Sequence, residues 1–167
     1  MSALDSVDVT LSGYYPGAIG DITRLHATYY HEHWGFDVSF ESQVGKELSE
    51  FMQGFREDQD LLVTAAVNGH FAGSAAVNGQ PDVVGQARLR WFIVRPDLQG
   101  LGLGQDLLGR ALEFSKKAGF RKVILWTFQG LDSARRLYER AGFRLTEEHS
   151  AQQWGSIISE QKFVLDL

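Results

Sequence analysis

Hydrophobic residues recur along the chain at two different spacings. In residues 18–34 and 40–55, apolar and aromatic residues return every three or four positions, which predicts two amphipathic helices. Alternating or continuous apolar runs predict strands at residues 7–14, 61–67, 71–77, 87–94, 122–128, 143–152 and 158–165. Helical spacing returns at residues 101–118 and 132–141. The predicted order of elements is therefore βααβββαβαββ.

This order predicts an α/β (α+β) fold, with a mixed central sheet of about seven strands and helices on both faces. The predicted strand KVILWTF, residues 122–128, is almost entirely apolar, as expected for a strand covered on both sides. The length of 167 residues suits one domain spanning residues 1–167.

Composition and charge narrow the classes of function. The net charge is −5 and the basic clusters are short, so nucleic acid is not an expected partner. The chain has no cysteine, and we expect neither disulfides nor a bound metal. No apolar run reaches the roughly 20 residues of a membrane helix. The first ten residues lack the basic and apolar regions of a signal peptide. We therefore expect a cytoplasmic protein with no membrane partner.

Three alternate glycines, Gly100, Gly102 and Gly104, join a predicted strand to a predicted helix. The N-terminus of a helix carries unpaired backbone N–H groups and attracts anions. Glycines let the backbone approach such an anion closely. The segment thus predicts a phosphate or pyrophosphate site, the alternative being a turn that only connects two elements. Walker and Rossmann spacings do not fit, because Leu107 stands where a Rossmann loop needs glycine.

The pattern Gln99-x-x-Gly102-x-Gly104, after a strand that ends in V-x-P, resembles the acetyl-CoA loop of the GNAT superfamily of N-acetyltransferases. The segment LDSARRLYERAGF, residues 131–143, is similar to a later motif of that superfamily, N-x-x-A-x-x-L-Y-E-x-x-G-F. It departs from the motif at Leu131, where the family often has asparagine. A looser resemblance links the chain to acetyltransferase domains that are sometimes fused to winged-helix regulators. The resemblance implies acetyl-CoA as the donor substrate.

The resemblance also implies which residues bind the donor. They are Phe92, Ile93, Val94, Gln99, Gly100, Leu101, Gly102, Leu103, Gly104, Ser133 and Arg136. A backbone N–H near Ile93 or Val94 is expected to stabilise the thioester oxygen. Tyr138 matches the general acid of the family, which protonates the leaving thiolate. The alternative is that its ring only packs in the core.

The prediction of acceptor-binding residues rests on weaker sequence signals than that of the donor site. Many members of the family have a glutamate eleven residues before the glutamine of the loop, where this chain has Arg88. Strand alternation places Arg88 and Arg90 on one face, and Leu89 and Trp91 on the other. A guanidinium binds carboxylates well, so either arginine is a candidate clamp for an acceptor carboxylate. Pairing with an acid on a neighbouring strand is the alternative.

The first predicted helix is rich in aromatic residues and histidines. His26 and Tyr30 are four residues apart, so they share a face and are candidate acceptor-binding residues. A histidine on this helix is also a candidate base. Further candidate bases are Glu147, Glu148 and His149. Trp126 and Trp154 can either line the cleft or fill the core, and their size favours the core.

These observations predict an acetyl-CoA-dependent N-acetyltransferase in which a small-molecule amine bearing a carboxylate attacks the thioester directly. Three alternatives stay open: a non-catalytic acyl-CoA sensor, an acetyltransferase for protein amino groups and, less favoured, an NAD-binding domain. The resemblance is also compatible with a homodimer.

Overall fold

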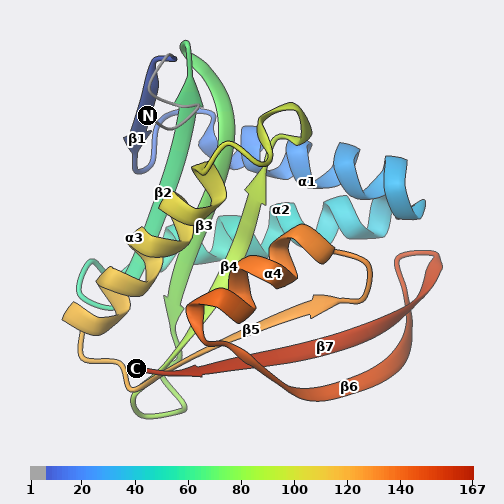
Figure 1. Ribbon diagram of the computed structural model, residues 1–167. Coiled ribbons are helices and arrows are strands. Elements are labelled where there is room, and N and C mark those ends of the chain that lie inside the picture. Colours follow the sequence, from blue (N-terminus) through green and yellow to red (C-terminus); the bar gives the residue numbers. More distant parts are fainter. Residues whose placement is uncertain (1–6) are drawn as a thin grey trace.

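Seven strands form one mixed sheet in the computed structural model, which describes residues 7–167 (Figure 1). Residues 1–6, on which much of the signal-peptide expectation rests, lie outside the described residues. The strands are β1 (Val9–Ser12), β2 (Asp60–Val67), β3 (His70–Gly79), β4 (Gln86–Val94), β5 (Lys122–Phe128), β6 (Arg144–Gln153) and β7 (Ser156–Asp166). Their spatial order is β1-β2-β3-β4-β5-β7-β6, and only β4 and β5 pair in parallel. The predicted fold class and element order are confirmed.

Four α-helices cover the two faces of the sheet (Figure 1). They are α1 (Ala18–Trp34) and α2 (Val38–Gln53) on one face, and α3 (Leu103–Lys117) and α4 (Asp132–Ala141) on the other. The α2 helix begins after Asp37, whose carboxylate accepts a hydrogen bond from the backbone N–H of Ser39 at 3.0 Å. The α3 helix begins at Leu103 rather than at the predicted Leu101, and a 3₁₀ helix precedes it at Pro96–Leu98. Among the described residues, no helix has both the length and the apolar character that crossing a membrane requires.

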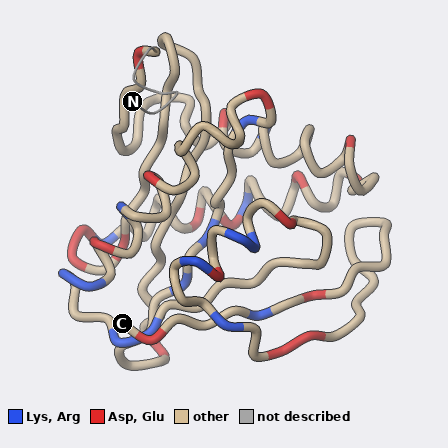
Figure 2. Tube along the Cα trace, viewed as in Figure 1, with Lys and Arg blue, Asp and Glu red and all other residues tan. Residues whose placement is uncertain are grey.

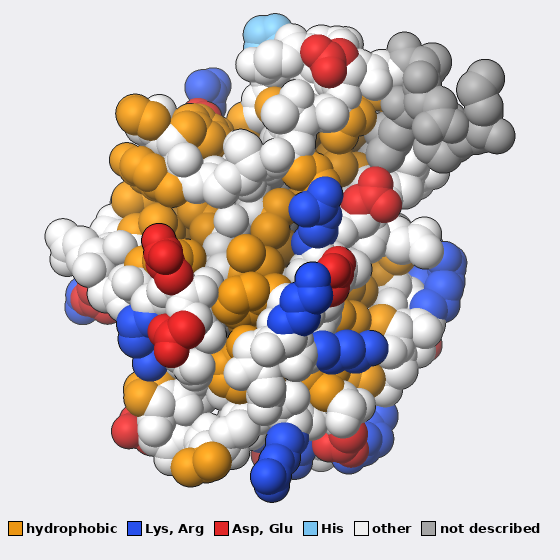
Figure 3. Space-filling model, turned by 90° about the vertical axis from the view of Figure 1, so that its left-hand side faces the viewer, with side chains coloured by type: hydrophobic (Ala, Val, Ile, Leu, Met, Phe, Trp, Pro, Cys, Tyr) orange, Lys and Arg blue, Asp and Glu red, His pale blue; other side chains and the backbone are white. Residues whose placement is uncertain are grey.

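Charged side chains of both signs are distributed over the helices and strands (Figure 2). The α4 helix carries Arg135, Arg136 and Arg140, and Arg135 forms a 2.7 Å ion pair with Glu139 of the same helix. On the face shown in Figure 3, Lys and Arg side chains lie close to Asp and Glu, with hydrophobic side chains between them. The charge on this face is therefore mixed rather than of one sign.

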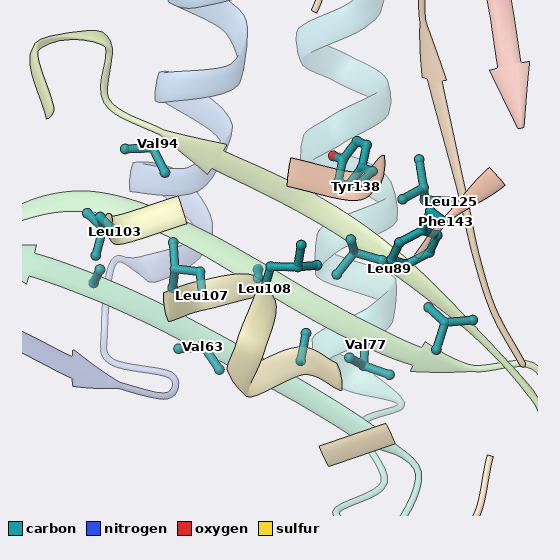
Figure 4. Close-up of a cluster of buried hydrophobic side chains, with 14 of the residues drawn as sticks. Val63, Val77, Leu89, Val94, Leu103, Leu107, Leu108, Leu125, Tyr138 and Phe143 are labelled. Atoms are coloured by element: carbon teal, nitrogen blue, oxygen red, sulfur yellow. The ribbon is translucent and has the colours of Figure 1, made fainter. Parts of the chain in front are cut away.

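The sheet separates two hydrophobic cores. Between the sheet and the α3–α4 layer lies a cluster that includes Leu89, Leu107 and Leu125 (Figure 4). Between the sheet and the α1–α2 layer lies an aromatic cluster that includes Phe36 and Phe128. Burying each large apolar side chain contributes about 1.5–3 kcal/mol, so both faces of β4 and β5 are held against helices.

The β4 strand contains a bulge. The β3–β4 register shifts between Ser74 and Ala76, and Trp91 adopts a φ of +46°. The buried Ser74 hydroxyl donates a 2.7 Å hydrogen bond to the Trp91 carbonyl, which supports this irregular backbone. The extra residue changes which face the following side chains occupy. The predicted alternation is therefore wrong at Trp91, which packs in the α1–α2 core with the Arg90 guanidinium 4.2 Å from its ring centre.

Beyond their first residues, β4 and β5 are not hydrogen-bonded to each other. Parallel pairing joins Gln86–Arg88 to Lys122–Ile124, and the two strands then diverge (Figure 1). The rest of β4, up to Val94, keeps β3 on one edge, and no strand within residues 7–167 pairs with its other edge. An open strand edge offers backbone groups to an extended ligand.

Candidate active site

A cavity of about 520 Å³ lies where β4 and β5 diverge. Residues from α1, α2, α4 and four strands line it: His26, Tyr30, Phe40, Gln43, Val44, Glu47, Arg88, Leu89, Arg90, Trp91, Phe92, Leu125, Trp126, Thr127, Phe128, Leu131, Ala134, Tyr138, His149, Gln153, Trp154, Ile158 and Glu160. Two of them, Tyr30 and Tyr138, belong to the cores on opposite faces of the sheet. The cavity therefore passes through the opening between the strands.

Of the two positions considered for Trp126 and Trp154, the structure shows the cavity wall rather than the fully buried core that their size favoured. Both side chains are half-buried and line the cavity. Trp154 packs against Phe36 and Phe40, with ring centres 5.0 Å apart in each pair, and its indole N–H donates to Gln43 at 2.9 Å. The part of the sheet that carries Trp126 is not covered by α1 or α2, so these rings form walls of a cavity instead of a closed interior.

Arg90 is already paired. Its guanidinium donates to Glu47 on α2, with 15% of the arginine side chain exposed. Burial lowers the pKa of Arg90, and the neighbouring Glu47 opposes that effect. The partner is thus an acid on a helix, whereas the alternative considered from the sequence was an acid on a neighbouring strand.

Arg88 is half-buried in the same cavity and has no such partner among the described residues. Its Nε atom is enclosed and has no hydrogen-bond partner among the described residues. Burial lowers the pKa of Arg88 to about 10, as does the neighbouring Arg90, while Glu47 and Glu160 oppose the shift. A buried guanidinium without a partner is costly, so the protein holds here a cation that an anion can neutralise.

The two candidates on α1 both reach the cavity. His26 is buried, and its Nδ1 lies 2.8 Å from the Ile22 carbonyl oxygen. A carbonyl only accepts, so Nδ1 carries the proton and Nε2 has the free lone pair. Burial lowers the pKa of His26 to about 4, which keeps the ring neutral at pH 7 but makes it a weak base. Burial also raises the pKa of the Tyr30 hydroxyl.

Tyr138 lies at the end of the α3–α4 core beside Leu125 and Phe143 (Figure 4). Its side chain is 6% exposed, and its hydroxyl forms no hydrogen bond within residues 7–167. Burial, together with the neighbouring Tyr30, raises the pKa of this hydroxyl. Tyr138 is therefore both a core residue and a protonated donor at the edge of the cavity.

The glycine loop has the features of an anion site. Gly100 and Gly102 have φ of +80° and +94°, and no atom lies within 4 Å of a Cβ placed on either residue. In the described chain, no carbonyl accepts from the backbone N–H groups of residues 100–105, and no side chain caps α3. Leu101 is half-buried and Gly102 is exposed, so their backbones are accessible to a ligand, whereas Leu103 is fully buried, main chain included, and packs in the α3–α4 core. Unpartnered N–H groups at a helix N-terminus suit a phosphate.

Two other residues of the loop have structural contacts. The Gln99 side chain donates to the Val94 carbonyl at 3.3 Å, which fixes the loop against the end of β4. A Cβ on Gly104 would lie 3.0 Å from the Leu137 side chain, so this glycine permits the close approach of α3 and α4. The sequence had assigned both residues to donor binding alone.

The backbone of β4 has one N–H group directed at the opening. Arg95 N–H donates to the Ala72 carbonyl on β3, and successive residues of a strand point their amides to opposite edges. The N–H of Val94 therefore faces the open edge, whereas that of Ile93 faces β3. Phe92 contributes its side chain to the cavity, with its ring centre 5.7 Å from that of Tyr138.

The two candidates on α4, Ser133 and Arg136, lie outside the cavity. Both are exposed, and the Arg136 guanidinium donates to the Ser133 hydroxyl at 3.3 Å. At the position of the absent asparagine, Leu131 lines the cavity with an apolar side chain.

Sequence analysis missed Glu47 and Glu160, the two carboxylates that line the cavity. Neither was singled out from the sequence as a site residue: Glu47 reaches Arg90 through the packing of α2 on the sheet, and Glu160 enters the cavity from β7, which pairs with β5. Of the candidate bases on β6, His149 lines the cavity. Glu147 lies 3.8 Å from Lys162, and Glu148 accepts from Ser159 at 2.8 Å; neither lines the cavity.

Comparison with known proteins agrees with this geometry. Residues 21–143 match the model of the acetyltransferase (GNAT) family. An uncharacterized N-acetyltransferase of Schizosaccharomyces pombe is 31% identical over 137 residues, which cover 80% of this chain and 81% of that protein. A structure described as a GNAT-family acetyltransferase from Desulfovibrio desulfuricans matches with a TM-score of 0.76 at 23% identity, covering 95% of this chain and 99% of the other. Salmonella typhimurium yncA, solved with acetyl-CoA, matches with a TM-score of 0.70 at 18% identity, covering 95% and 94%.

Proposed function

The chain belongs to the acetyltransferase (GNAT) family, and we propose that it transfers the acetyl group of acetyl-CoA to a small amine that carries a carboxylate. The single observation that carries the choice of acceptor is Arg88, a buried guanidinium in the cavity whose Nε has no partner among the described residues. We propose the cytoplasm as its compartment, in keeping with a chain that has no cysteine.

The donor half of the proposal uses the loop before α3. The backbone N–H groups of residues 100–105 would hold the pyrophosphate, and the exposed Arg136 on α4 can add a cation near that end. The pantetheine arm would lie along the open edge of β4 like an added strand. These roles are supported by the φ values of Gly100 and Gly102 and by the missing strand partner of β4.

The transfer needs a polarised carbonyl and a proton for the leaving thiolate. The Val94 N–H, which faces the opening, would donate to the thioester oxygen as charge develops there. The amine nitrogen attacks the carbonyl carbon, the C–S bond breaks, and the phenol of Tyr138 donates its proton to the sulfur. The raised pKa keeps the Tyr138 hydroxyl protonated at neutral pH but makes it a weaker acid, so the support for this role is its position at the edge of the cavity.

The acceptor half uses the α1–α2 side of the cavity. Arg88 would bind the carboxylate in a charge-assisted pair, while Arg90 stays bound to Glu47. The aromatic walls provided by Phe40, Phe128 and Trp154 suit an apolar portion of the acceptor. A volume of about 520 Å³ is in the range of small-molecule sites.

The test is CoA release with the standard amino acids and with their carboxamides as matched acceptors. We expect turnover with several amino acids and a loss of at least tenfold in kcat/KM for the amides. Arg88→Gln should raise the KM of the amino acid and leave the dissociation constant of acetyl-CoA unchanged. Arg90→Gln is the comparison variant for Arg88→Gln, because it also removes one cation from the cavity.

Two results would favour the alternatives. Equal turnover of acids and amides, with Arg88→Gln matching the wild type, would remove the carboxylate clamp and leave other amines, including protein amino groups. Tight acetyl-CoA binding with no CoA release from any amine would favour a sensor.

A further inference from the structure

Glu160 on β7 is a carboxylate of the cavity that no sequence motif marks. It lies opposite Phe128 of β5 and His149 of β6 in the sheet register. One of its oxygens is 2.8 Å from His149 Nε2, and the other accepts from Gln153 Nε2 at 2.7 Å. With 23% of its side chain exposed, it is held in position yet still reachable from the cavity.

Among the described residues, Arg88 and Glu160 form no ion pair with a Lys, Arg, Asp or Glu side chain, although Glu160 is close enough to favour the charged form of Arg88. Arg90 is bound to Glu47, so Arg88 is the remaining cation and Glu160 the remaining acid. The side chain of Glu160 shares its face of the sheet with Phe128, which packs in the α1–α2 core, and Arg88 lines the same cavity. A cation and an acid within one small cavity are complementary to an amine that also carries a carboxylate.

We propose that Glu160 binds the ammonium group of the acceptor and takes its proton, an inference that rests on the proposed acetyl transfer. A free alkylamine has a pKa of about 10, so at pH 7 it must lose a proton before it can attack. Glu160 accepts that proton, and the freed electron pair of nitrogen forms the bond to the acetyl carbon. The C–S pair goes to sulfur, which Tyr138 protonates. The second nitrogen proton and the proton on Glu160 leave to water, and the phenol is restored from water.

His149 and Gln153 act as positioning residues in this scheme. A carboxylate only accepts, so His149 donates through Nε2–H, and the ring does not itself compete for the acceptor's proton at that atom. Together the two donors hold both oxygens of Glu160. Bound this way, the carboxylate keeps free lone pairs for an ammonium group.

Glu160→Gln is the central variant, with Glu147→Gln as its matched control. Glu147 lies on the neighbouring strand, faces Lys162 and does not line the cavity. With an amino acid that the wild type acetylates, we expect Glu160→Gln to lower kcat/KM at pH 7 by about 10²–10⁴-fold, the usual contribution of a general base. Glu147→Gln should stay within about twofold of the wild type, and both should bind acetyl-CoA normally in calorimetry.

The pH profile separates proton transfer from a structural role. In Glu160→Gln only the free amine reacts, so its rate should rise about tenfold per pH unit until the pH approaches the amine's own pKa of about 10. The other charged or titratable groups around this part of the cavity are present in both proteins; they are Arg88, Arg90, Glu47, His26, His149, Lys162, Tyr30 and Tyr138. A fluorinated amino acid whose amine is neutral at pH 7 should show a much smaller loss.

Glu160→Asp is the control for misfolding of Glu160→Gln. It keeps a carboxylate at this position, so it should retain part of the activity with a wild-type pH dependence. A loss in Glu160→Gln that is equal at every pH and for every amine, or an activity within threefold of the wild type, would overturn the proton-transfer role. In that case wild-type turnover of amino acids would leave the proposed function intact. Absence of wild-type turnover with every amine would instead overturn both.

Discussion

Replacing Arg88 with methionine should stabilise the protein while it removes recognition of the acceptor. Methionine keeps the length and most of the volume of the arginine stem, and it leaves no polar atom to satisfy. The enclosed Nε of Arg88 has no partner among residues 7–167, so removing it breaks no hydrogen bond at that atom. A residue that is retained for ligand binding can lower the stability of the fold, so replacing it should stabilise the protein and abolish binding.

The magnitude follows from the pKa of Arg88, which burial, together with the neighbouring Arg90, lowers by about 2.5 units to about 10. At 1.36 kcal/mol per unit, the charged form is disfavoured in the folded protein by about 3 kcal/mol. The residue is only half-buried, so we retain about 1–2 kcal/mol of this after allowing for solvent screening. The penalty is present in full below pH 10 and declines only as the pH rises from 10 towards 12.5.

Thermal unfolding at pH 7 measures the effect. A gain of about 1–2 kcal/mol corresponds to a rise in Tm of about 2–8 °C for a domain of this size. Arg90→Met is the matched control: it leaves Glu47 without its partner and should lower Tm or leave it unchanged. A drop in Tm for Arg88→Met, with acceptor KM unaltered, would refute the view of Arg88 as an unpaired cation held for a ligand.

Three further predictions test other parts of the site. Tyr138→Phe should lower kcat by about 10²–10⁴-fold, and because its hydroxyl has no partner among the described residues, Tm should change little; wild-type kcat would exclude it as the general acid. Gly102→Ala places a side chain at a φ of +94°, so we expect a loss of about 1–2 kcal/mol in urea unfolding and weaker acetyl-CoA binding by calorimetry. Burial lowers the pKa of His26 to about 4, whereas the unfolded chain keeps the ordinary value of about 6.5. As the pH falls from 6.5 to 4, the ring is protonated in the unfolded state but not in the folded state, so about 3 kcal/mol of stability is lost. His26→Asn should flatten that fall in Tm, and an equally steep fall in the variant would place the acid sensitivity elsewhere.

The donor half of the site could be predicted from local sequence, because its chemistry resides in consecutive backbone atoms. Gly100 and Gly102 combine positive φ with a helix start, and both features are local. Tyr138 was found in the same way, from a motif on one helix. The second role of Gly104, the close approach of α4, could not be predicted because Leu137 comes from another element.

The face on which Trp91 lies shows the limit of pattern reasoning. A period of two assumes a regular strand, and the bulge supported by Ser74 on the neighbouring strand breaks that period. The same bulge leaves Arg88, Arg90 and Trp91 directed to one side. Trp126 and Trp154 were placed in the core by size alone, whereas the uncovered half of the sheet makes them walls of the cavity.

The sequence by itself determined the order of the elements, the fold class and the loop before α3, because these depend on hydrophobic spacing and on residues adjacent in the chain. Only the tertiary structure decided which charges meet. Glu47 lies 43 residues from Arg90, and Glu160 shares a cavity with Arg88 although the two lie on separate strands. Packing of α2 on the sheet brings Glu47 to Arg90, and the pairing of β7 with β5 brings Glu160 into the cavity. Arg88 forms no ion pair among the described residues, and desolvation of its guanidinium is what suits it to bind an anion.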